Sequence, residues 1–272
     1  MRLQVNSART GVQWVRMGVR TFLRQPLAMS GLFFMFMAAV SVLSLVPLVG
    51  TAVSIALVPA ATLGLMAATR EAEQGRFPMP SQLIAAFRGG TQRTQAMLML
   101  GGLYALALLV VVGLVGLLAG DMPAPAADAA GGAEVTPEMV GAALGRPGMW
   151  VAMLAYLPVL MAFWHAPPLV FWHGVKPAKS LFFSLVACWS TKAALFFFTI
   201  GWIAVFMITG LILGVLGTLL GGAEALQIVV YPIVLFMASM FHTSLWFTFR
   251  DSFHFDEAGA SPGPAPTEGD TP

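Results

Sequence analysis

The chain contains one stretch that decides its fold, AALFFFTIGWIAVFMITGLILGVLGTLL at Ala193–Leu220, which has no Asp, Glu, Lys or Arg. A helix rises about 1.5 Å per residue, so about 20 apolar residues cross the hydrocarbon core of a bilayer. This stretch is therefore long enough to span a membrane as one helix. Five further windows share its character: Leu27–Val46, Val49–Thr69, Gln95–Ala119, Trp150–Trp172 and Leu226–Phe249.

The overall composition agrees with a membrane protein. Hydrophobic residues make up 58% of the chain and charged residues only 10%, whereas about a quarter of an average soluble chain is charged. Because backbone groups inside a bilayer must bond to one another, we expect an all-α integral membrane bundle of six transmembrane helices. The net charge of +2 is spread beside the spans, so membrane lipids are the expected partners and nucleic acid is not.

Basic residues mark which side of the membrane each connection occupies. They gather before the first span, between the second and third, and between the fourth and fifth, and Arg250 closes the sixth. Since Lys and Arg accumulate in short cytoplasmic loops, the pattern predicts an inner-membrane protein with both termini in the cytoplasm. Arg146 is the exception, because it lies at the end of a long acidic segment on the predicted outer side.

The spans pair into three hairpins, and each follows a short segment with apolar residues at helical spacing. We predict a six-span membrane domain at 1–250, built from repeats at about 9–70, 80–173 and 177–250, each an interfacial amphipathic helix plus a hairpin. Chance similarity among apolar helices is the alternative. The loop at 120–147 is predicted to lie outside, and 251–272, rich in Pro, Gly and acid, is predicted to be a disordered cytoplasmic tail.

The first short segment carries its arginines on one helical face and Trp14, Val15, Val19 and Phe22 on the other. This pattern predicts a helix in the membrane interface, with its rings among the acyl chains and its guanidinium groups at lipid headgroups. A basic topology signal without further role is the alternative. Predicted headgroup contacts, including the bases that close the second and third segments, are Arg9, Arg16, Arg20, Arg24, Arg88 and Lys192.

Helix breakers divide between the two helices of each hairpin. Interior prolines occur only in the second helices, which we expect to be kinked, with freed carbonyls bonded to a partner helix or water. First helices carry glycines four residues apart, which favour close helix packing. Packing within one chain is preferred over a homo-oligomer interface. The glycines singled out are Gly210, Gly214, Gly217 and Gly221.

Three polar residues occupy matching positions in the second helices. His165 and His242 each lie seven residues before the end of a predicted span, and Thr62 has the same place in span two. Around a pseudo-threefold centre they would form a polar layer, a proton or ligand site suited to a facilitator or channel. The alternative is that each imidazole binds a backbone carbonyl or reaches toward the interface.

Catalytic patterns are scarce. The chain has no H-E-x-x-H motif, no carboxylate inside a predicted span and no cysteine pair, so no metal, cofactor or enzyme activity is expected. Ser239 and His242 share a helix face, but no G-x-S-x-G or orienting acid accompanies them. Without a buried coupling charge, an ion-coupled symporter is disfavoured as well.

Two motifs carry a family resemblance. The block APPLVFWHGVKPAKSLFFSLVAC at Ala166–Cys188 and RQP at Arg24–Pro26 resemble bacterial multi-pass inner-membrane proteins of unknown function and, more remotely, the membrane domains attached to some glycerophosphodiester phosphodiesterases. The resemblance implies interfacial helices that lead into membrane hairpins. It carries over no catalytic residue, and Ser190 and Thr191 stand where the family often has a basic residue and an asparagine. The leading hypothesis is a non-enzymatic, lipid-interacting or envelope-maintenance protein.

Overall fold

The computed structural model describes residues 2–47, 49–119, 145–219 and 223–254. The predicted outer loop, apart from its last residues, the tail from residue 255 and Gly221 lie outside this part of the chain. Six helices are long and apolar enough to cross a membrane, which confirms the all-α six-span bundle. The spans are Pro26–Ser44, Val49–Glu73, Thr91–Leu118, Pro147–His173, Lys192–Leu219 and Val229–Ser252.

The spans form three hairpins, each preceded by a short helix. Hairpin one is α2 (Pro26–Ser44) with α3 (Val49–Glu73), hairpin two is α5 (Thr91–Ala119) with α8 (Pro147–Trp164), and hairpin three is α11 (Lys192–Leu219) with α12 (Ala223–Ser252). The short elements are α1 (Ala8–Arg24), η1 (Pro80–Gln82), α4 (Ala85–Arg88), α9 (Ala166–His173) and α10 (Pro177–Ser190).

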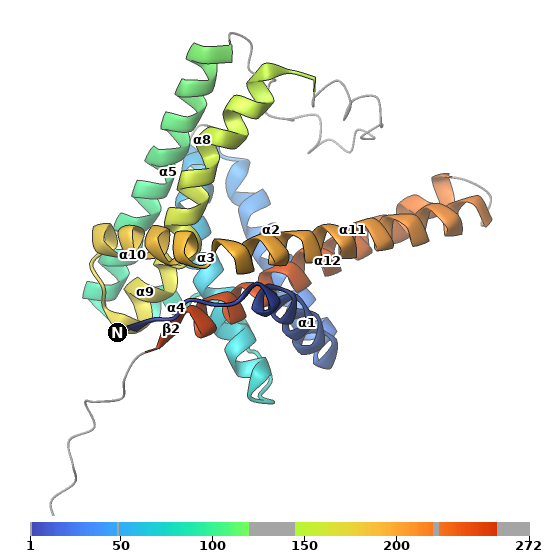
Figure 1. Cartoon of the computed structure of the whole chain (residues 1–272), viewed down its shortest axis with the longest axis horizontal. Coiled ribbons are helices and arrows are strands. Elements are labelled where there is room, and N and C mark those ends of the chain that lie inside the picture. The colour runs from blue at the N-terminus through green and yellow to red at the C-terminus, as the bar shows by residue number, and fades with distance from the viewer. Residues whose placement is uncertain (1, 48, 120–144, 220–222, 255–272) are drawn as a thin grey trace, which may run out of the picture.

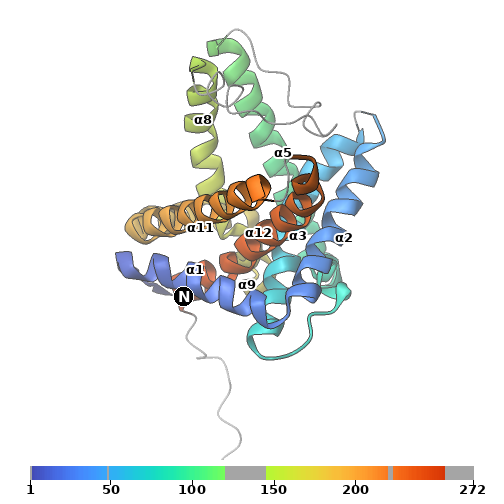
Figure 2. The ribbon, with the colours of Figure 1, turned by 90° about the vertical axis from the view of Figure 1, so that its right-hand side faces the viewer.

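The hairpins meet at one end of the bundle and diverge from it. In Figures 1 and 2, α5 and α8 rise together while α11 and α12 run across the view, so these two hairpins point in very different directions. We call the end where the hairpins meet the base. It carries α1, η1, α4, α9 and α10. Helices of 28 to 30 residues are longer than the bilayer core is thick.

The base contains the buried core. Its three clusters of buried side chains center on Trp14 and Phe198, on Phe22 and Leu65, and on Leu63 and Val170. Toward the far ends of the hairpins the helices expose apolar side chains over most of their circumference, as at Leu211 and Leu219 of α11. Each far end therefore meets lipid on most of its faces.

The short helices pack in a cyclic order. Helix α1 contacts hairpin three, α4 lies between α3 and α5, and α10 packs against α8 of hairpin two. Each short helix thus touches the hairpin that precedes it, and the first touches the last. A threefold duplication would produce this order. The duplication itself stays a prediction.

The two ends of the described chain meet at the base. Strand β1 (Arg2–Leu3) pairs antiparallel with β2 (Phe253–His254), which directly follows α12. Both ends therefore lie on one side of the bundle, as an even number of spans requires. The predicted domain end at residue 250 is too early, because Asp251 and Ser252 continue α12 and bind the base. An acidic residue before a Pro- and Gly-rich segment resembles the start of a tail, and only its contacts distinguish it.

Candidate functional site

A network of charged and indole groups joins α1, α3 and α12 at the base. Arg250 donates from Nη1 to Glu73 and from Nε to Asp251 Oδ1 at 2.7 Å. The second oxygen of each acid accepts an indole N–H, from Trp246 to Glu73 at 2.7 Å and from Trp14 to Asp251 at 2.9 Å. Every carboxylate oxygen in the network is bonded. The network fixes α1 and the end of α3 to the last turns of α12.

Arg70 extends this network toward α9. Its guanidinium carbon lies 5.7 Å from the Trp172 ring centroid and 5.9 Å from that of Trp246, within cation–π range. The sequence patterns did not single out Glu73, and they assigned Asp251 to the C-terminal tail. Asp251 follows Arg250 directly, and Glu73 comes three residues after Arg70. Acids beside the basic residues that end two spans were the available signal.

Helix α1 exposes its arginine face and buries the other. Arg9, Arg16, Arg20 and Arg24 are all exposed, and none pairs with an acid among the described residues. Trp14 and Phe22 are fully buried against α11 and α12 and against hairpin one. The prediction that the rings lie among acyl chains is therefore wrong. Protein side chains, rather than lipid, cover them.

Two glycines allow α1 to approach hairpin three closely. A Cβ at Gly11 would lie 2.0 Å from the carbonyl oxygen of Ala194, and one at Gly18 would lie 2.5 Å from Cβ of Ser244. Both positions therefore accept only glycine without movement of α11 or α12. The sequence reasoning had drawn attention to the glycines of the spans and not to these.

The span glycines behave differently from the expectation. A Cβ at Gly210 or Gly214 would meet no atom within 4 Å, so this pair does not pack against another described helix. The intrachain packing predicted for these two residues is therefore wrong, because hairpin three diverges from its neighbours. Gly217 is buried, and its role in packing stays a prediction. A homo-oligomer through the free face stays a prediction.

Helix α10 has the opposite burial from α1. Phe182 and Trp189 are 62% and 65% exposed, and the Lys192 ammonium lies 5.0 Å from the Trp189 ring centroid. Ser180, Ser184 and Cys188 face inward. Burial raises the pKa of the Cys188 thiol to about 12, so the thiol stays protonated. Lys192 and Arg88 are both exposed at the base.

The inward face of α10 supports a break in the fourth span. The fourth span, which was predicted to be kinked, is interrupted at His165, between α8 and α9, where Pro167 and Pro168 follow. The Ser184 hydroxyl accepts the His165 N–H at 2.9 Å and donates to the Met161 carbonyl at 2.7 Å. It thereby replaces the helical bond that would join those two groups directly. A partner helix thus satisfies the carbonyl that the break at His165 leaves free.

Thr62, His165 and His242 do not form a polar layer with one another. Thr62 donates to the carbonyl of Val58 in its own helix, and His242 Nδ1 bonds the Ala238 carbonyl at 2.8 Å. His165 is fully buried beside Phe249 and Phe253, and among the described residues neither ring nitrogen has a hydrogen-bond partner. No contact joins any two of the three within the described residues. His242 therefore has the alternative arrangement considered from the sequence, in which the imidazole binds a backbone carbonyl.

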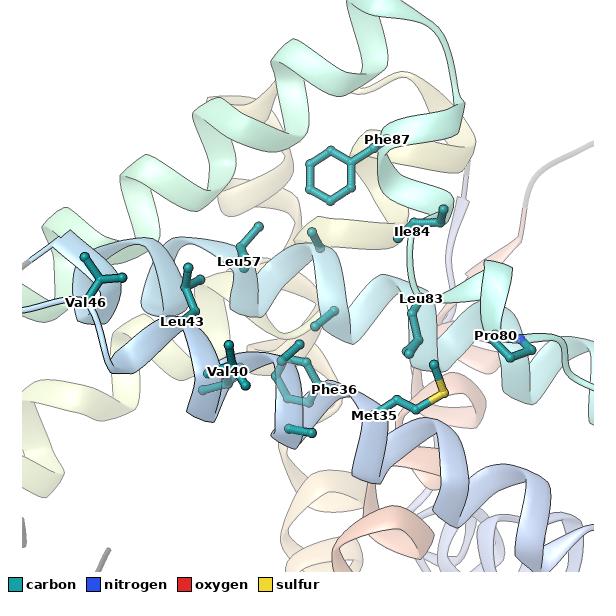
Figure 3. A pocket seen from close by; sticks show the side chains of 15 residues that line it. Met35, Phe36, Val40, Leu43, Val46, Leu57, Pro80, Leu83, Ile84 and Phe87 are labelled. Carbon is teal, nitrogen blue, oxygen red and sulfur yellow. The ribbon is translucent and has the colours of Figure 1, made fainter.

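An apolar groove of about 790 Å³ runs between α2, α3 and the η1–α4 segment. Figure 3 shows Val46 and Leu43 toward one end and Pro80, Leu83 and Ile84 toward the other. All of its lining side chains are apolar, and Thr62, His165 and His242 are not among them. The groove suits an aliphatic chain, because it offers contact surface and no polar group. Its chemistry does not suit an ion or a polar solute.

Comparisons with known proteins identify one relative and no structural template. No protein-family model matches the chain, and no solved structure matches it. The chain is 36% identical over 265 residues to a protein of Burkholderia thailandensis that is named a probable inner membrane protein. The match covers 96% of this chain and 97% of that protein. With its six apolar helices, the chain belongs to the same family of multi-pass inner-membrane proteins.

Proposed function

We propose that this protein retains anionic phospholipids at the base side of the inner membrane and has an envelope-maintenance role without a catalytic centre. The observation that carries the proposal is the exposed face of α1. Its four arginines have no acidic partner among the described residues, whereas Arg76 and Arg250 at the base do. Guanidinium groups form paired hydrogen bonds with phosphate oxygens, so these side chains are suited to lipid headgroups.

The rigid attachment of α1 supports this role. Its buried rings and the Trp14–Asp251 bond hold the helix against α11 and α12. The arginines therefore keep a common direction without the entropy loss of ordering a loose helix. Each basic residue near an anionic surface contributes about 1 kcal/mol. A row of four would enrich anionic lipid around the base.

We further propose that the base faces the cytoplasm, with both ends of the chain on that side. The basic residues between spans support this orientation. A green fluorescent protein fused to the C-terminus is expected to fluoresce, and an alkaline phosphatase fused there is expected to be inactive. The reverse result would place the arginines on the outer side.

The remote likeness to membrane domains of glycerophosphodiester phosphodiesterases stays a prediction from the sequence. A role beside lipid would suit such a likeness. The facilitator hypothesis rested on a shared layer of Thr62, His165 and His242, and these side chains make their contacts separately. We therefore propose the lipid role alone.

Native mass spectrometry of the purified protein tests this role. In detergent extracts from membranes of known composition, phosphatidylglycerol and cardiolipin are expected to be enriched over their bulk share. Arg16→Gln should lower the enrichment about fivefold, the equivalent of about 1 kcal/mol. Arg146 is an exposed arginine at the start of α8 and away from the base. Arg146→Gln is therefore the matched control and should leave the lipid enrichment unchanged. Retained lipid that mirrors the bulk composition would refute the proposal.

A further inference from the structure

The groove beside α2 is hollow because small residues line its centre. Ala38 and Ala39 of α2 are opposed by Ala60 and Ala61 of α3, and the latter two are at most 9% exposed. Larger side chains form the rims, so a trough remains between two helices that touch. Figure 3 shows the rim residues along it, from Val46 and Leu43 past Leu57 to Phe36, Leu83 and Phe87.

The length of the groove matches one leaflet. Its lining on α2 extends from Met35 to Val46, about 16 Å at 1.5 Å per residue. Half of the hydrocarbon core of a bilayer is about 15 Å. Because the groove begins about 14 Å along α2 from Pro26, an acyl chain anchored at the base would enter at the Met35 end and fill part of the groove. Each buried methylene contributes about 0.8 kcal/mol relative to water, but much less relative to bulk lipid, so the headgroup must supply the selectivity.

Two exposed arginines adjoin segments that lead to the base end of the groove. Phe87 lines this end, and the next residue, Arg88, is exposed. Gln25 donates from Nε2 to the Arg76 carbonyl at 3.3 Å, which brings the exposed Arg24 of α1 close to the loop that leads to Pro80. Glu71 is the acid in this neighbourhood, and it pairs with Arg76. The guanidinium groups of Arg24 and Arg88 have no acidic partner among the described residues.

We propose that this groove is a binding site for one anionic phospholipid, with an acyl chain between α2 and α3 and the phosphate at Arg24 and Arg88. The proposal rests on the lipid role proposed above and assigns it a place. Charge complementarity decides the occupant. An apolar helix of a second copy would fill the trough but leave the arginines without a counter-charge.

Photochemical labelling locates the chain directly. The full protein is reconstituted in nanodiscs of phosphatidylcholine that contain phosphatidylglycerol with a diazirine in its acyl chain. After irradiation and digestion, adducts are expected to concentrate on peptides with Met35–Val46 and Leu57–Ala61. Phosphatidylcholine that carries the same diazirine should label these peptides about fivefold less, the equivalent of about 1 kcal/mol at the headgroup.

A matched pair of substitutions tests the groove itself. Ala39→Phe places a ring in the trough, and Ala204→Phe makes the same change at an exposed position of α11. Groove labelling should fall about fivefold in the first variant and stay unchanged in the second. Because both alanines are partly or fully exposed, both variants should keep the wild-type melting temperature in detergent, which is measured alongside.

Each outcome distinguishes this site from the general lipid role. The groove site is wrong if the wild type enriches anionic lipid but the photolabel is spread evenly over all exposed spans. It is also wrong if Ala39→Phe leaves the groove labelling unchanged. In either case the α1 arginines alone explain the enrichment. If two copies of the chain cross-link to each other and the groove of that dimer is not labelled, the second copy occupies the groove. That result would likewise overturn the lipid site. Absence of enrichment in the wild type would refute the proposed function instead.

Discussion

Helices α1 and α10 are both short and amphipathic and both lead into a hairpin, yet they bury opposite faces. Helix α1 buries Trp14 and Phe22 in the base and exposes arginines, whereas α10 buries serines and Cys188 and exposes Phe182 and Trp189. The first uses its rings to bind protein, and the second leaves its rings exposed. Amphipathic spacing therefore identifies a two-faced helix without saying which face meets the membrane.

The difference follows from what each helix must satisfy. Helix α10 lies against a broken span, and its Ser184 hydroxyl completes the backbone bonding there. A serine is small enough to enter the break and carries both a donor and an acceptor. Helix α1 lies against α11 and the last turns of α12, which no break interrupts. Its contact is therefore built from rings and glycines.

The largest expected effect is the loss of stability when a buried ring of α1 is removed. Trp14→Ala removes a fully buried indole and leaves one Asp251 oxygen without its donor, at a cost of about 3–5 kcal/mol. Trp189→Ala removes the same side chain from the exposed face of α10 and should cost less than about 0.5 kcal/mol. Unfolding in mixed micelles titrated with dodecyl sulfate measures both. Equal losses would show that α1 is not part of the core.

The next effect concerns the contact between α1 and hairpin three. Gly11→Ala forces a methyl group against the Ala194 carbonyl and should destabilise the protein by about 1–3 kcal/mol. Gly210→Ala, at a helical glycine with open space around it, should be neutral or stabilising by up to about 1 kcal/mol. The same micelle titration applies. Destabilisation by Gly210→Ala would indicate that its face packs against another copy.

An effect of similar size is expected on the inner face of α10. Ser184→Ala leaves the His165 N–H and the Met161 carbonyl without their shared partner, at a cost of about 1–3 kcal/mol. Ser190→Ala, a serine of the same helix outside this bridge, is the control and should be near neutral. Amide hydrogen exchange at His165 should accelerate in the first variant alone. Unchanged exchange would mean that the hydroxyl bridge does not hold the break.

The smallest expected effect is a difference in thiol reaction rate between the exposed faces of α1 and α10, without a change in stability. Arg16→Cys should react with a membrane-impermeant maleimide from water, whereas Phe182→Cys should react on the order of tenfold more slowly, because each unit of raised thiol pKa removes tenfold of the reactive thiolate. Native Cys188, with a pKa of about 12, contributes little background. Equal rates would place both outer faces in water and remove the distinction between the two helices.

Local patterns were sufficient for some features and not for others. The six spans, the hairpin order and the break near Pro167 and Pro168 depend on hydropathy and on missing backbone donors, which neighbouring residues determine. The partners of Asp251 and the surroundings of His165 depend on residues from distant segments. Matching positions along three helices suggested that Thr62, His165 and His242 face a common centre. Instead, His165 packs against Phe249 and Phe253, and His242 bonds a carbonyl of its own helix.

By itself, the sequence determined that this chain is a six-span, all-helical membrane protein, because apolar runs of bilayer length leave the backbone no other way to satisfy its hydrogen bonds. It also determined that arginines form one face of α1, since that follows from spacing within a single helix. Only the tertiary structure decided which faces meet protein and which meet lipid. In a bilayer both environments are apolar, so hydropathy cannot separate them, and close packing between distant segments makes the choice.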